Sequence, residues 1–182
     1  MNKSKNFTNP RDVIRKRREK LHIRKGYFSL ILRLILIGAM GYILLTQVFL
    51  ITRAKGNDMF PAIKDGDLVI AFRIQKEYVK DDIAVYQRDD SFYLGRVVAR
   101  ETDVVTLDET GMLLVNGTVQ RGEIVYPTLA KEGYNYPMRI EEGDLFLLGD
   151  HRMESQDSRD FGPISLKHVK GKVITILRRR GL

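Results

Sequence analysis

The stretch LGDHRMESQDSRDFG, residues 148–162, holds more polar and charged side chains than a surface turn requires. Turn formation explains its two glycines, but not the combination of polar residues between them. These residues are Asp150, Arg152, Ser155, Asp157, Ser158 and Arg159. A solvated loop is one interpretation. The other is an ordered network in which Asp157 and Arg159 form a charge-assisted pair that holds the loop in place.

The apolar runs around this stretch are short, alternate with turns and favour strands over helices. They are DLVIAFRI (67–74), DIAVYQR (82–88), FYLGRVVAR (92–100), DVVTLD (103–108), MLLV (112–115), DLFLLGD (144–150) and KVITILR (172–178). All are rich in β-branched or other apolar residues, and Asn116-Gly117 is a strong two-residue hairpin signal. Residues 126–137, YPTLAKEGYNYP, are predicted to be an extended loop. The pattern predicts a mainly antiparallel β domain with a barrel-like core.

One long apolar run precedes these strands. Residues 27–51, YFSLILRLILIGAMGYILLTQVFLI, are long enough for a transmembrane helix, which needs about 20 apolar residues. The apolar region of a cleaved signal peptide has only about 7–15 residues, and ITRAKG after the run is a poor cleavage site. Arg33 lies near the start of the run, where its side chain can reach the headgroups. We therefore predict a single uncleaved transmembrane helix.

The net charge of +8 is concentrated before this helix. Residues 1–26 contain ten Lys or Arg and two acidic residues, whereas residues 52–182 contain 20 basic and 21 acidic residues. The nearly neutral C-terminal part argues against a nucleic-acid partner. The basic tail places the N-terminus in the cytoplasm by the positive-inside rule. We predict a basic cytoplasmic tail (1–26), a transmembrane signal-anchor helix (27–51) and an extracytoplasmic β domain (52–182), that is, a single-pass type II protein of the cell membrane.

The order of these elements resembles the type I signal peptidases, membrane-bound Ser/Lys endopeptidases that remove signal peptides from exported proteins. The family's Ser-Met-x-Pro loop matches DMFP at 58–61, its Gly-Asp-x-Val motif matches GDLV at 66–69, and its Lys-Arg-Val strand matches GRV at 95–97. Its Gly-Asp-Asn-Arg-x-x-Ser-x-Asp-Ser-Arg-x-Phe-Gly box matches residues 149–162 at every fixed position except Asn, which is His151. The resemblance covers essentially the whole chain and implies a signal-peptidase-type β domain on one transmembrane helix.

The resemblance also places two departures at the catalytic positions. In the family the Ser attacks the scissile carbonyl, and the Lys, whose pKa is lowered by burial, accepts its proton. Here these positions are Asp58 and Gly95. Glycine supplies no base, although it lets a chain or loop approach closely. Attack by an aspartate on an amide would give a mixed anhydride that expels carboxylate more readily than amine, so this route returns to substrate. The resemblance thus implies a degenerate nucleophile and base beside intact supporting residues Ser155, Asp157 and Arg159.

The residue types present leave other catalytic arrangements open. Asp58 and Asp157 can be written as a carboxylate dyad that activates water, although pairing with Arg159 would keep Asp157 ionised. Ser155, His151 and Asp157 permit a triad, although adjacency in sequence is poor evidence for triad geometry.

The loop Met59-Phe60-Pro61 lies close to the anchor in sequence, and the corresponding family loop lies at the membrane. We expect a membrane-proximal loop whose Met59-Phe60 tip either enters the outer leaflet or packs in the core. Asp58 makes this region negative and is a candidate partner for Arg96.

The acidic residues and histidine of the box do not predict a metal centre. The spacing of Asp150, His151 and Asp157 fits no zinc or calcium pattern. We expect no metal and no other cofactor.

Among family members, the chain resembles the signal-peptidase-like proteins of Gram-positive pilus gene clusters, which lack the catalytic pair and are needed for pilin polymerisation beside a sortase. This resemblance implies a non-catalytic assembly factor or chaperone whose partners are the lipid bilayer, pilin subunit precursors and a sortase. The alternative is an active type I signal peptidase that processes exported or pilin precursors by an unconventional site. A third hypothesis is a structural scaffold that does not use the substrate groove of the family.

Overall fold

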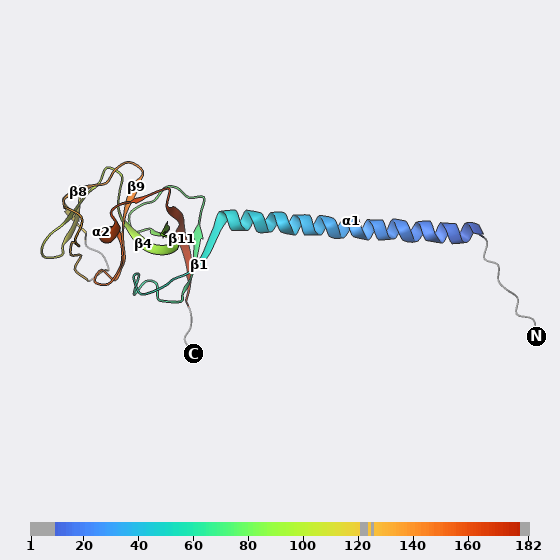
Figure 1. Ribbon diagram of the computed structural model, residues 1–182, viewed down its shortest axis with the longest axis horizontal. Coiled ribbons are helices and arrows are strands. Elements are labelled where there is room, and N and C mark those ends of the chain that lie inside the picture. The colour runs from blue at the N-terminus through green and yellow to red at the C-terminus, as the bar shows by residue number, and fades with distance from the viewer. Residues whose placement is uncertain (1–9, 121–123, 125, 179–182) are drawn as a thin grey trace, which may run out of the picture. The chain divides into compact units, whose positions relative to one another are not determined.

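The computed structural model describes residues 10–120, 124 and 126–178 (Figure 1). The chain divides into two compact units, Met1–Thr46 and Gln47–Leu182, and each is described by itself. Most of the predicted basic tail lies in the helix described next, while residues 1–9 lie outside the described residues.

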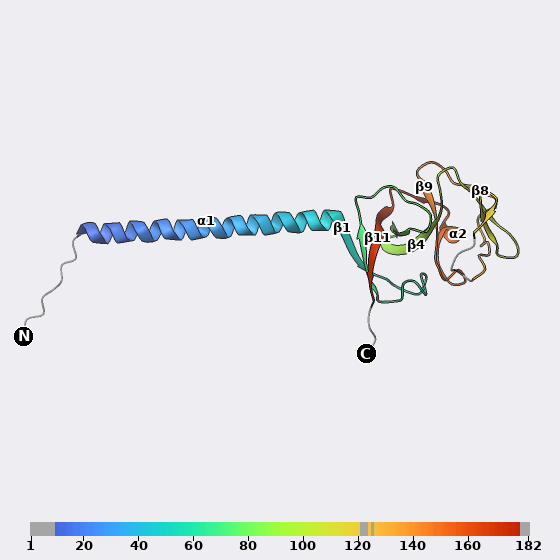
Figure 2. The same cartoon turned by 180° about the vertical axis from the view of Figure 1, so that it is seen from behind.

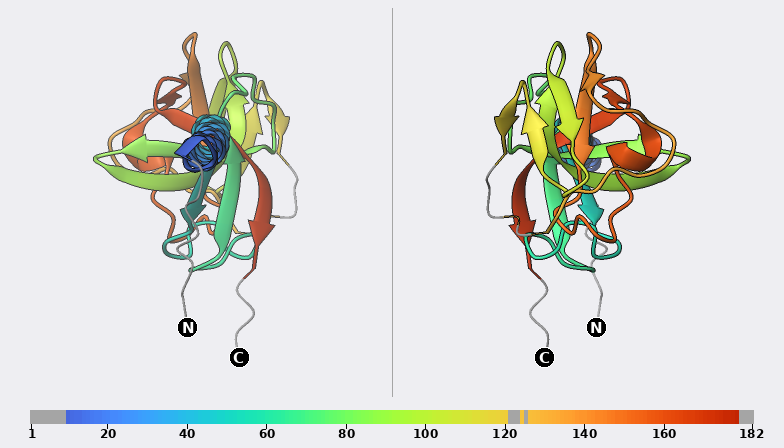
Figure 3. Two further views of the ribbon diagram at one scale, coloured as in Figure 1. Left: turned by 90° about the vertical axis from the view of Figure 1, so that its right-hand side faces the viewer. Right: turned by 90° about the vertical axis from the view of Figure 1, so that its left-hand side faces the viewer.

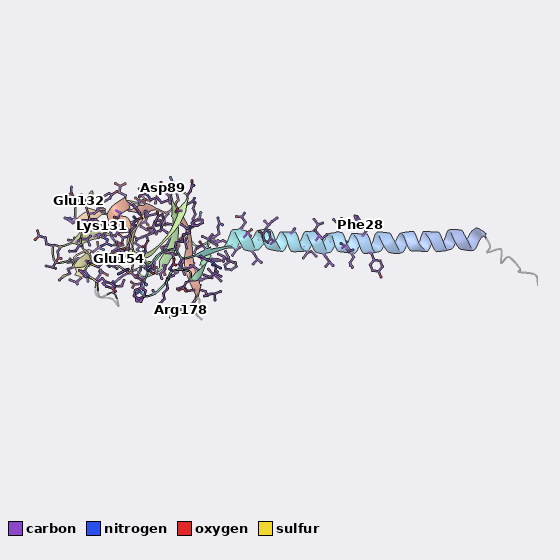
Figure 4. All side chains as sticks on the ribbon, turned by 60° about the horizontal axis from the view of Figure 1, so that its bottom comes forward. Phe28, Asp89, Lys131, Glu132, Glu154 and Arg178 are labelled. Atoms are coloured by element: carbon purple, nitrogen blue, oxygen red, sulfur yellow. The ribbon has the colours of Figure 1, made fainter. Side chains whose placement is uncertain are left out.

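The first unit is dominated by one continuous helix, α1 (Pro10–Val48) (Figures 1 and 2). Its segment Gly26–Val48 has a mean hydropathy of 2.2 and none of it is buried. At 1.5 Å per residue, 23 residues extend about 35 Å, which is enough to cross a bilayer. Its large apolar side chains project into the surroundings, as Phe28 does in Figure 4.

The predicted C-terminal boundary of this helix is wrong by three residues. The helix ends at Val48, and Phe49–Arg53 form a strand instead of continuing to residue 51. The five residues pair in antiparallel register with Leu68–Phe72. Cross-strand pairing therefore overrides an apolar pattern that suits a helix equally well.

The described part of the second unit contains eleven strands and one short helix. In chain order they are β1 (Phe49–Arg53), β2 (Leu68–Phe72), β3 (Ile83–Arg88), β4 (Ser91–Arg100), β5 (Val104–Leu107), β6 (Leu113–Val115), β7 (Thr118–Val119), β8 (Met138–Arg139), β9 (Asp144–Leu148), α2 (Ser158–Phe161), β10 (Ile164–Ser165) and β11 (Val169–Leu177). All seven predicted strands are present. The strands β1, β7, β8 and β10 and the helix α2 were not predicted, because four of the five have only two to four residues.

The strands form two antiparallel sheets, seen from opposite sides in Figure 3. The larger has the order β1-β2-β11-β3-β4-β9-β10, and the smaller has the order β7-β6-β5-β8. Register shifts within β11 and β4 mark irregularities of the kind that bend a sheet, and the large sheet is visibly curved rather than flat. The prediction of a mainly antiparallel β fold is confirmed.

Strand β9 explains how the polar box is positioned. Leu145, Phe146, Leu147 and Leu148 are each at most 3% exposed, because alternate side chains enter two different core clusters. A strand buried on both faces is expected to be continuously apolar rather than alternating. Its last residue is followed directly by Gly149, so the polar box begins in the interior of the domain.

Candidate functional site

The box between β9 and β10 forms an ordered network rather than a solvated loop. Arg159 is 1% exposed and Asp157 is completely buried. Arg159 donates from Nε to Asp157 Oδ1 (2.9 Å) and from Nη2 to Asp157 Oδ2 (2.8 Å). Ser155 Oγ donates to Asp157 Oδ2 (2.7 Å), and so does the backbone N–H of Gly149 (3.1 Å). The predicted charge-assisted pair between Asp157 and Arg159 is therefore present.

This network also satisfies the local backbone. Asp157 is the N-cap of α2 and accepts from the backbone N–H of Arg159 (3.0 Å), while Asp160 completes a capping box. Arg159 Nη2 donates to the carbonyl of Arg152 (2.6 Å) and Nη1 to that of Leu129 (3.2 Å). Hydrogen bonds from Arg159, Ser155 and the backbone hold the pKa of Asp157 below its ordinary value although burial acts in the opposite direction. Asp157 is thus kept ionised as a structural anion.

Gly149 brings the box against the loop that contains Asp58. A Cβ atom at Gly149 would lie 2.6 Å from the carbonyl oxygen of Asp58 and 2.5 Å from Ser155 Oγ. The next peptide group uses this proximity, because the backbone N–H of His151 donates to the Asp58 carbonyl (2.9 Å). The two motifs that the sequence singled out are therefore in direct contact, although more than 90 residues separate them in the chain.

Asp58 is partly buried and lies among charged groups that already have partners. Burial raises the pKa of its carboxyl group, the negative charge of Asp157 adds to this effect, and Lys131 and the backbone of Gln156 oppose it. Lys131 is itself engaged, since Nζ donates to the Ser155 carbonyl (2.6 Å) and to Asp160 Oδ2 (2.7 Å). Asp58 forms no ion pair with any residue in the described part of the chain.

The space beside Gly95 is filled by its neighbours. A Cβ atom on Gly95 would lie 3.0 Å from Leu147 Cβ and 3.3 Å from Tyr86 Cε1. Tyr86 is on the adjacent strand β3, completely buried, and stacks on Tyr93 with 5.6 Å between the ring centroids. Gly95 therefore permits a close approach, as expected, and the residues that approach it are Leu147 and Tyr86 of the domain itself.

The hydroxyl group of Tyr86 is unusual. It is buried and has no hydrogen-bond partner among the described residues. Burial raises its pKa well above the ordinary value, and the charges of Asp157 and Asp58 add to this effect. The hydroxyl is therefore kept neutral and is hydrogen-bonded to neither carboxylate.

The proposed pair between Asp58 and Arg96 is not the arrangement observed. Arg96 binds Asp150 in a bidentate manner, with Nε–Oδ1 and Nη2–Oδ2 distances of 2.7 and 2.6 Å. Asp150 is 2% exposed. The pair therefore ties β4 to the start of the box rather than neutralising Asp58.

The loop Met59-Phe60-Pro61 divides between core and surface. Met59 is 2% exposed and belongs to the core cluster with Ile63 and Val69, so core packing is the correct interpretation for this residue. Phe60 is 37% exposed, and Pro61 is also exposed.

The alternative catalytic arrangements are not assembled. Ser155 Oγ donates to Asp157 and not to His151. The His151 ring lies beside Tyr126 (5.0 Å between centroids), and its Nδ1 has no hydrogen-bond partner among the described residues. Asp157 is committed to Arg159, which leaves it unsuited to share a proton with Asp58. Within the described ranges, no group of three His, Cys, Asp or Glu side chains is placed to hold a metal ion.

A cavity of about 170 Å³ opens beside Asp58. Two segments form its walls, residues 52–56 at the end of β1 and just beyond it and residues 91–94 of β4, with Met59, Ile63 and Val85 completing it. Strand β9 pairs with β4 from Arg96 onward, so the backbone edge of residues 91–94 has β3 on one side and no paired strand on the other in the described part of the sheet. Such an edge can accept an extended polypeptide.

Comparison with known proteins identifies the family. The sequence pattern described as "Signal peptidase, peptidase S26" matches residues 27–177. The chain belongs to the signal peptidase family. This match includes the apolar helix as well as the β domain, and it confirms the resemblance at the level of the family.

Among its relatives, the chain shares 33% identity over 131 residues with the probable thylakoidal processing peptidase 2 of Arabidopsis thaliana, covering 65% of this chain and 35% of that protein. The signal peptidase I of Bacillus licheniformis is 28% identical, with 64% and 70% of the two chains covered. A Staphylococcus aureus protein named inactive signal peptidase IA is 26% identical, with 82% and 88% covered. The chain thus spans about a third of the length of the plant relative. A signal peptidase I structure from Enterococcus faecalis aligns with 54% of this chain and 97% of its own, at 23% identity and a TM-score of 0.43.

Two residues around the candidate site escaped the sequence interpretation. Tyr86 is one of several apolar or aromatic residues in β3. Only its contact with Gly95 on the paired strand β4 distinguishes it from the others. Lys131 comes from the irregular loop after residue 126, and its Nζ reaches the box at the Ser155 carbonyl. Neither carries a motif, and both depend on tertiary contacts.

Proposed function

We propose that this signal-peptidase-like protein binds exported polypeptides without cleaving them and acts as an assembly factor or chaperone in pilus subunit polymerisation. One observation carries the proposal. The base position is Gly95, and the space beside it is filled by Tyr86 and Leu147, so position 95 supplies no side chain that could activate a nucleophile at position 58. Loss of both nucleophile and base leaves only the acceleration due to binding and oxyanion stabilisation.

The preserved surroundings support a binding role. The buried Asp157–Arg159 network and the cavity beside Asp58 are both intact. A segment added along residues 91–94 would be bound through its main chain, and the cavity would receive a side chain. The Staphylococcus aureus relative, named as inactive, supports the existence of family members without peptidase activity.

The proposed setting is the cell membrane. Helix α1 serves as the signal anchor, the basic N-terminal tail stays in the cytoplasm, and the β domain faces outward as in a single-pass type II protein. The proposed partners are the bilayer, pilin subunit precursors and a sortase. The resemblance to proteins of pilus gene clusters supports this choice of partners.

The first test is cleavage of a signal-peptide-bearing pilin precursor by the detergent-solubilised protein, beside Asp58→Ala and a restored enzyme. Restoration needs three changes, Asp58→Ser, Gly95→Lys and Tyr86→Ala, because the tyrosine ring stands next to the position of the lysine. If the native protein does not cleave the precursor and the restored protein does, the result supports a binding protein with an intact groove.

The alternative, an active peptidase with an unconventional site, makes the opposite prediction. The native protein would cleave the precursor and Asp58→Ala would not, which would refute the proposal. Precursor that is neither cut by the native protein nor retained by it on a column would also contradict a binding role.

The pilus role needs a separate test in a pilus-bearing host. Deletion of the gene should abolish the high-molecular-weight pilin ladder, and Asp58→Ala should restore it if no chemistry is required. An unchanged ladder after deletion would exclude the assembly role.

A further inference from the structure

A second cavity, of about 380 Å³, lies between elements of the two sheets. Its walls include β4 of the large sheet, β6 of the small sheet with the turn before it, and residues 126–128. Arg152 of the polar box also lines it. The cavity shares no lining residue with the one beside Asp58, so it is a separate place on the domain.

The walls of this cavity are tied to one another. Thr128 is 3% exposed, and its backbone N–H donates to the carbonyl of Gly111 (2.8 Å). Its Oγ1 accepts from Arg152 Nη1 (2.6 Å). A Cβ atom at Gly111 would lie 2.6 Å from Pro127 Cβ. The cavity is therefore built from segments that are packed against and hydrogen-bonded to each other.

Arg152 is a buried cation without a carboxylate partner. Its side chain belongs to a residue that is 6% exposed. Nε donates to the Gly149 carbonyl (2.8 Å) and Nη1 donates to Thr128, whereas Nη2 has no hydrogen-bond partner in the part of the chain that the structure describes. Arg159, by contrast, is paired with Asp157 at 2.8 Å. The guanidinium of Arg152 thus lines the cavity with one side unsatisfied.

The pKa of Arg152 is consistent with this shortage of negative charge. Burial lowers it to about 10, and the positive charge of Arg159 adds to this effect, while Asp150 and Asp157 oppose it. The group remains protonated near neutral pH, at a position where an uncompensated charge is costly.

The other charges of the lining nearly cancel. Lys80 and Asp81 carry opposite charges, and Arg96 is paired with Asp150 at 2.6 Å. Among the described residues, Arg152 therefore leaves the cavity with about one positive charge that is not compensated. A ligand with a single negative charge would balance it.

A second polar group in the same cavity also lacks a partner. Gln120 lines the cavity, and its buried Oε1 accepts no hydrogen bond from any described residue. Its Nε2 is already engaged, since it donates to the Thr118 carbonyl (2.8 Å). Buried polar groups normally have a partner, and exceptions call for an explanation. The cavity thus contains one unsatisfied donor and one unsatisfied acceptor.

From these observations we propose that the cavity binds the C-terminal residue of a polypeptide, with its carboxylate on Arg152 and its backbone N–H on Gln120. Such a residue carries one negative charge and one N–H donor on neighbouring atoms of the same Cα. Its side chain would contact the apolar part of the lining, which consists of Val98, Met112, Leu113, Ile124, Tyr126 and Pro127. This inference goes beyond the proposed function, because the site is separate from the groove beside Asp58.

Other ligands fit the cavity less well. A phosphate group carries nearly two negative charges near neutral pH, more than the lining balances. A cation would be repelled by Arg152, and a wholly apolar ligand would leave both polar groups unsatisfied. An Asp or Glu side chain also offers a carboxylate, and the test separates this source from a C-terminus.

The test uses the full-length protein in detergent micelles at low salt and three synthetic peptides. The first is N-acetyl-Ala-Ala-Leu with a free C-terminus, the second is its C-terminal amide, and the third is N-acetyl-Ala-Glu-Leu amide. Inorganic phosphate is the fourth probe. Binding is followed by NMR titration, which reports both affinity and location. The free acid should bind at least about tenfold more tightly than its amide, since hydrogen bonds to charged groups are the stronger ones. Chemical shifts should change at residues 110–113 and 126–128.

Variants connect this preference to the two polar residues. Arg152→Gln should abolish it, but the change also removes bonds to Gly149 and Thr128 and is expected to cost stability. Gln120→Glu leaves those bonds in place and puts a negative charge into the cavity, so it should also abolish the preference. Gln75→Glu is the matched control, because Gln75 is exposed and lies outside the lining, and it should leave the preference intact.

Several results would overturn the inference. A cavity that holds only water predicts equal binding of acid and amide, or no binding of either. A preference that survives Gln120→Glu, or shift changes confined to residues 52–56 and 91–94, would place the ligand elsewhere. Tighter binding of the Glu peptide or of phosphate than of the free acid would contradict the assignment to a C-terminus.

Discussion

Replacing Asp157 by Asn should destabilise the β domain strongly. The change preserves shape but leaves the Arg159 guanidinium, 1% exposed, without its carboxylate. It removes the ion pair at 2.8 Å and weakens the bonds from Ser155 and Gly149. Removing one partner of a buried ion pair typically costs about 3–5 kcal/mol. A domain of this size is stable by about 5–15 kcal/mol, so a large part of the folding free energy is lost.

The assay is equilibrium urea unfolding of the full-length protein in micelles, followed by tyrosine fluorescence because the chain has no Trp and eight Tyr. Asp89→Asn is the control, since the Arg88–Asp89 pair is exposed and such pairs contribute about 0–1 kcal/mol. The Asp157 variant should lose several times more stability than the control. A loss below about 1 kcal/mol would show that the network does not hold the domain together.

The pH dependence of this effect has a definite sign. The folded-state pKa of Asp157 lies below its ordinary value of 3.8. Its stabilisation is therefore present above that value and is lost as the pH falls through the folded-state pKa. The stability difference between the native protein and Asp157→Asn should shrink in acid, and a difference that grows there would contradict this assignment.

Three further outcomes are expected. Gly149→Ala should fail to fold or lose more than about 3 kcal/mol, because its Cβ would lie 2.6 Å from the Asp58 carbonyl; thermal unfolding monitored by circular dichroism checks this. Asp58→Asn should raise the melting temperature at pH 7, since the raised pKa of Asp58 means that folding penalises its charged form, and the gain should vanish below its ordinary pKa of 3.8. Arg96→Met should cost about 3–5 kcal/mol by leaving Asp150 buried and unpaired, and a variant as stable as the native protein in urea would refute that pairing.

The sequence predicted the secondary-structure elements well where the apolar and β-branched patterns are long. The seven strands were recognisable from β-branched runs, and the Asn116-Gly117 turn has the positive φ angles, 52° and 76°, that its sequence signals. The end of the helix was predicted wrongly because the apolar residues 49–51 suit a membrane helix and a strand equally well. Only their pairing with β2 decides between the two.

At the candidate site, the prediction succeeded for contacts within one motif and failed for contacts between motifs. Asp157 and Arg159 are two residues apart, so their pairing was readable from the box. Arg96 pairs with Asp150 rather than Asp58 because of the register between β4 and β9, and no local sequence pattern encodes that register. The same is true of Tyr86, whose role follows from its position on the strand next to Gly95.

The packing of Tyr86 against Gly95 makes a larger side chain at position 95 hard to accommodate. A lysine arriving alone at position 95 would meet Leu147 and the tyrosine ring and would be poorly accommodated. A small residue arriving alone at position 86 would leave a void in the core, at a cost of several kcal/mol for an aromatic side chain of this size, roughly 3–5. Either single change therefore lowers the stability of the β domain. Positions 86 and 95 are therefore coupled, and a variant with a lysine at position 95 needs a second, compensating change at position 86 before the domain packs well.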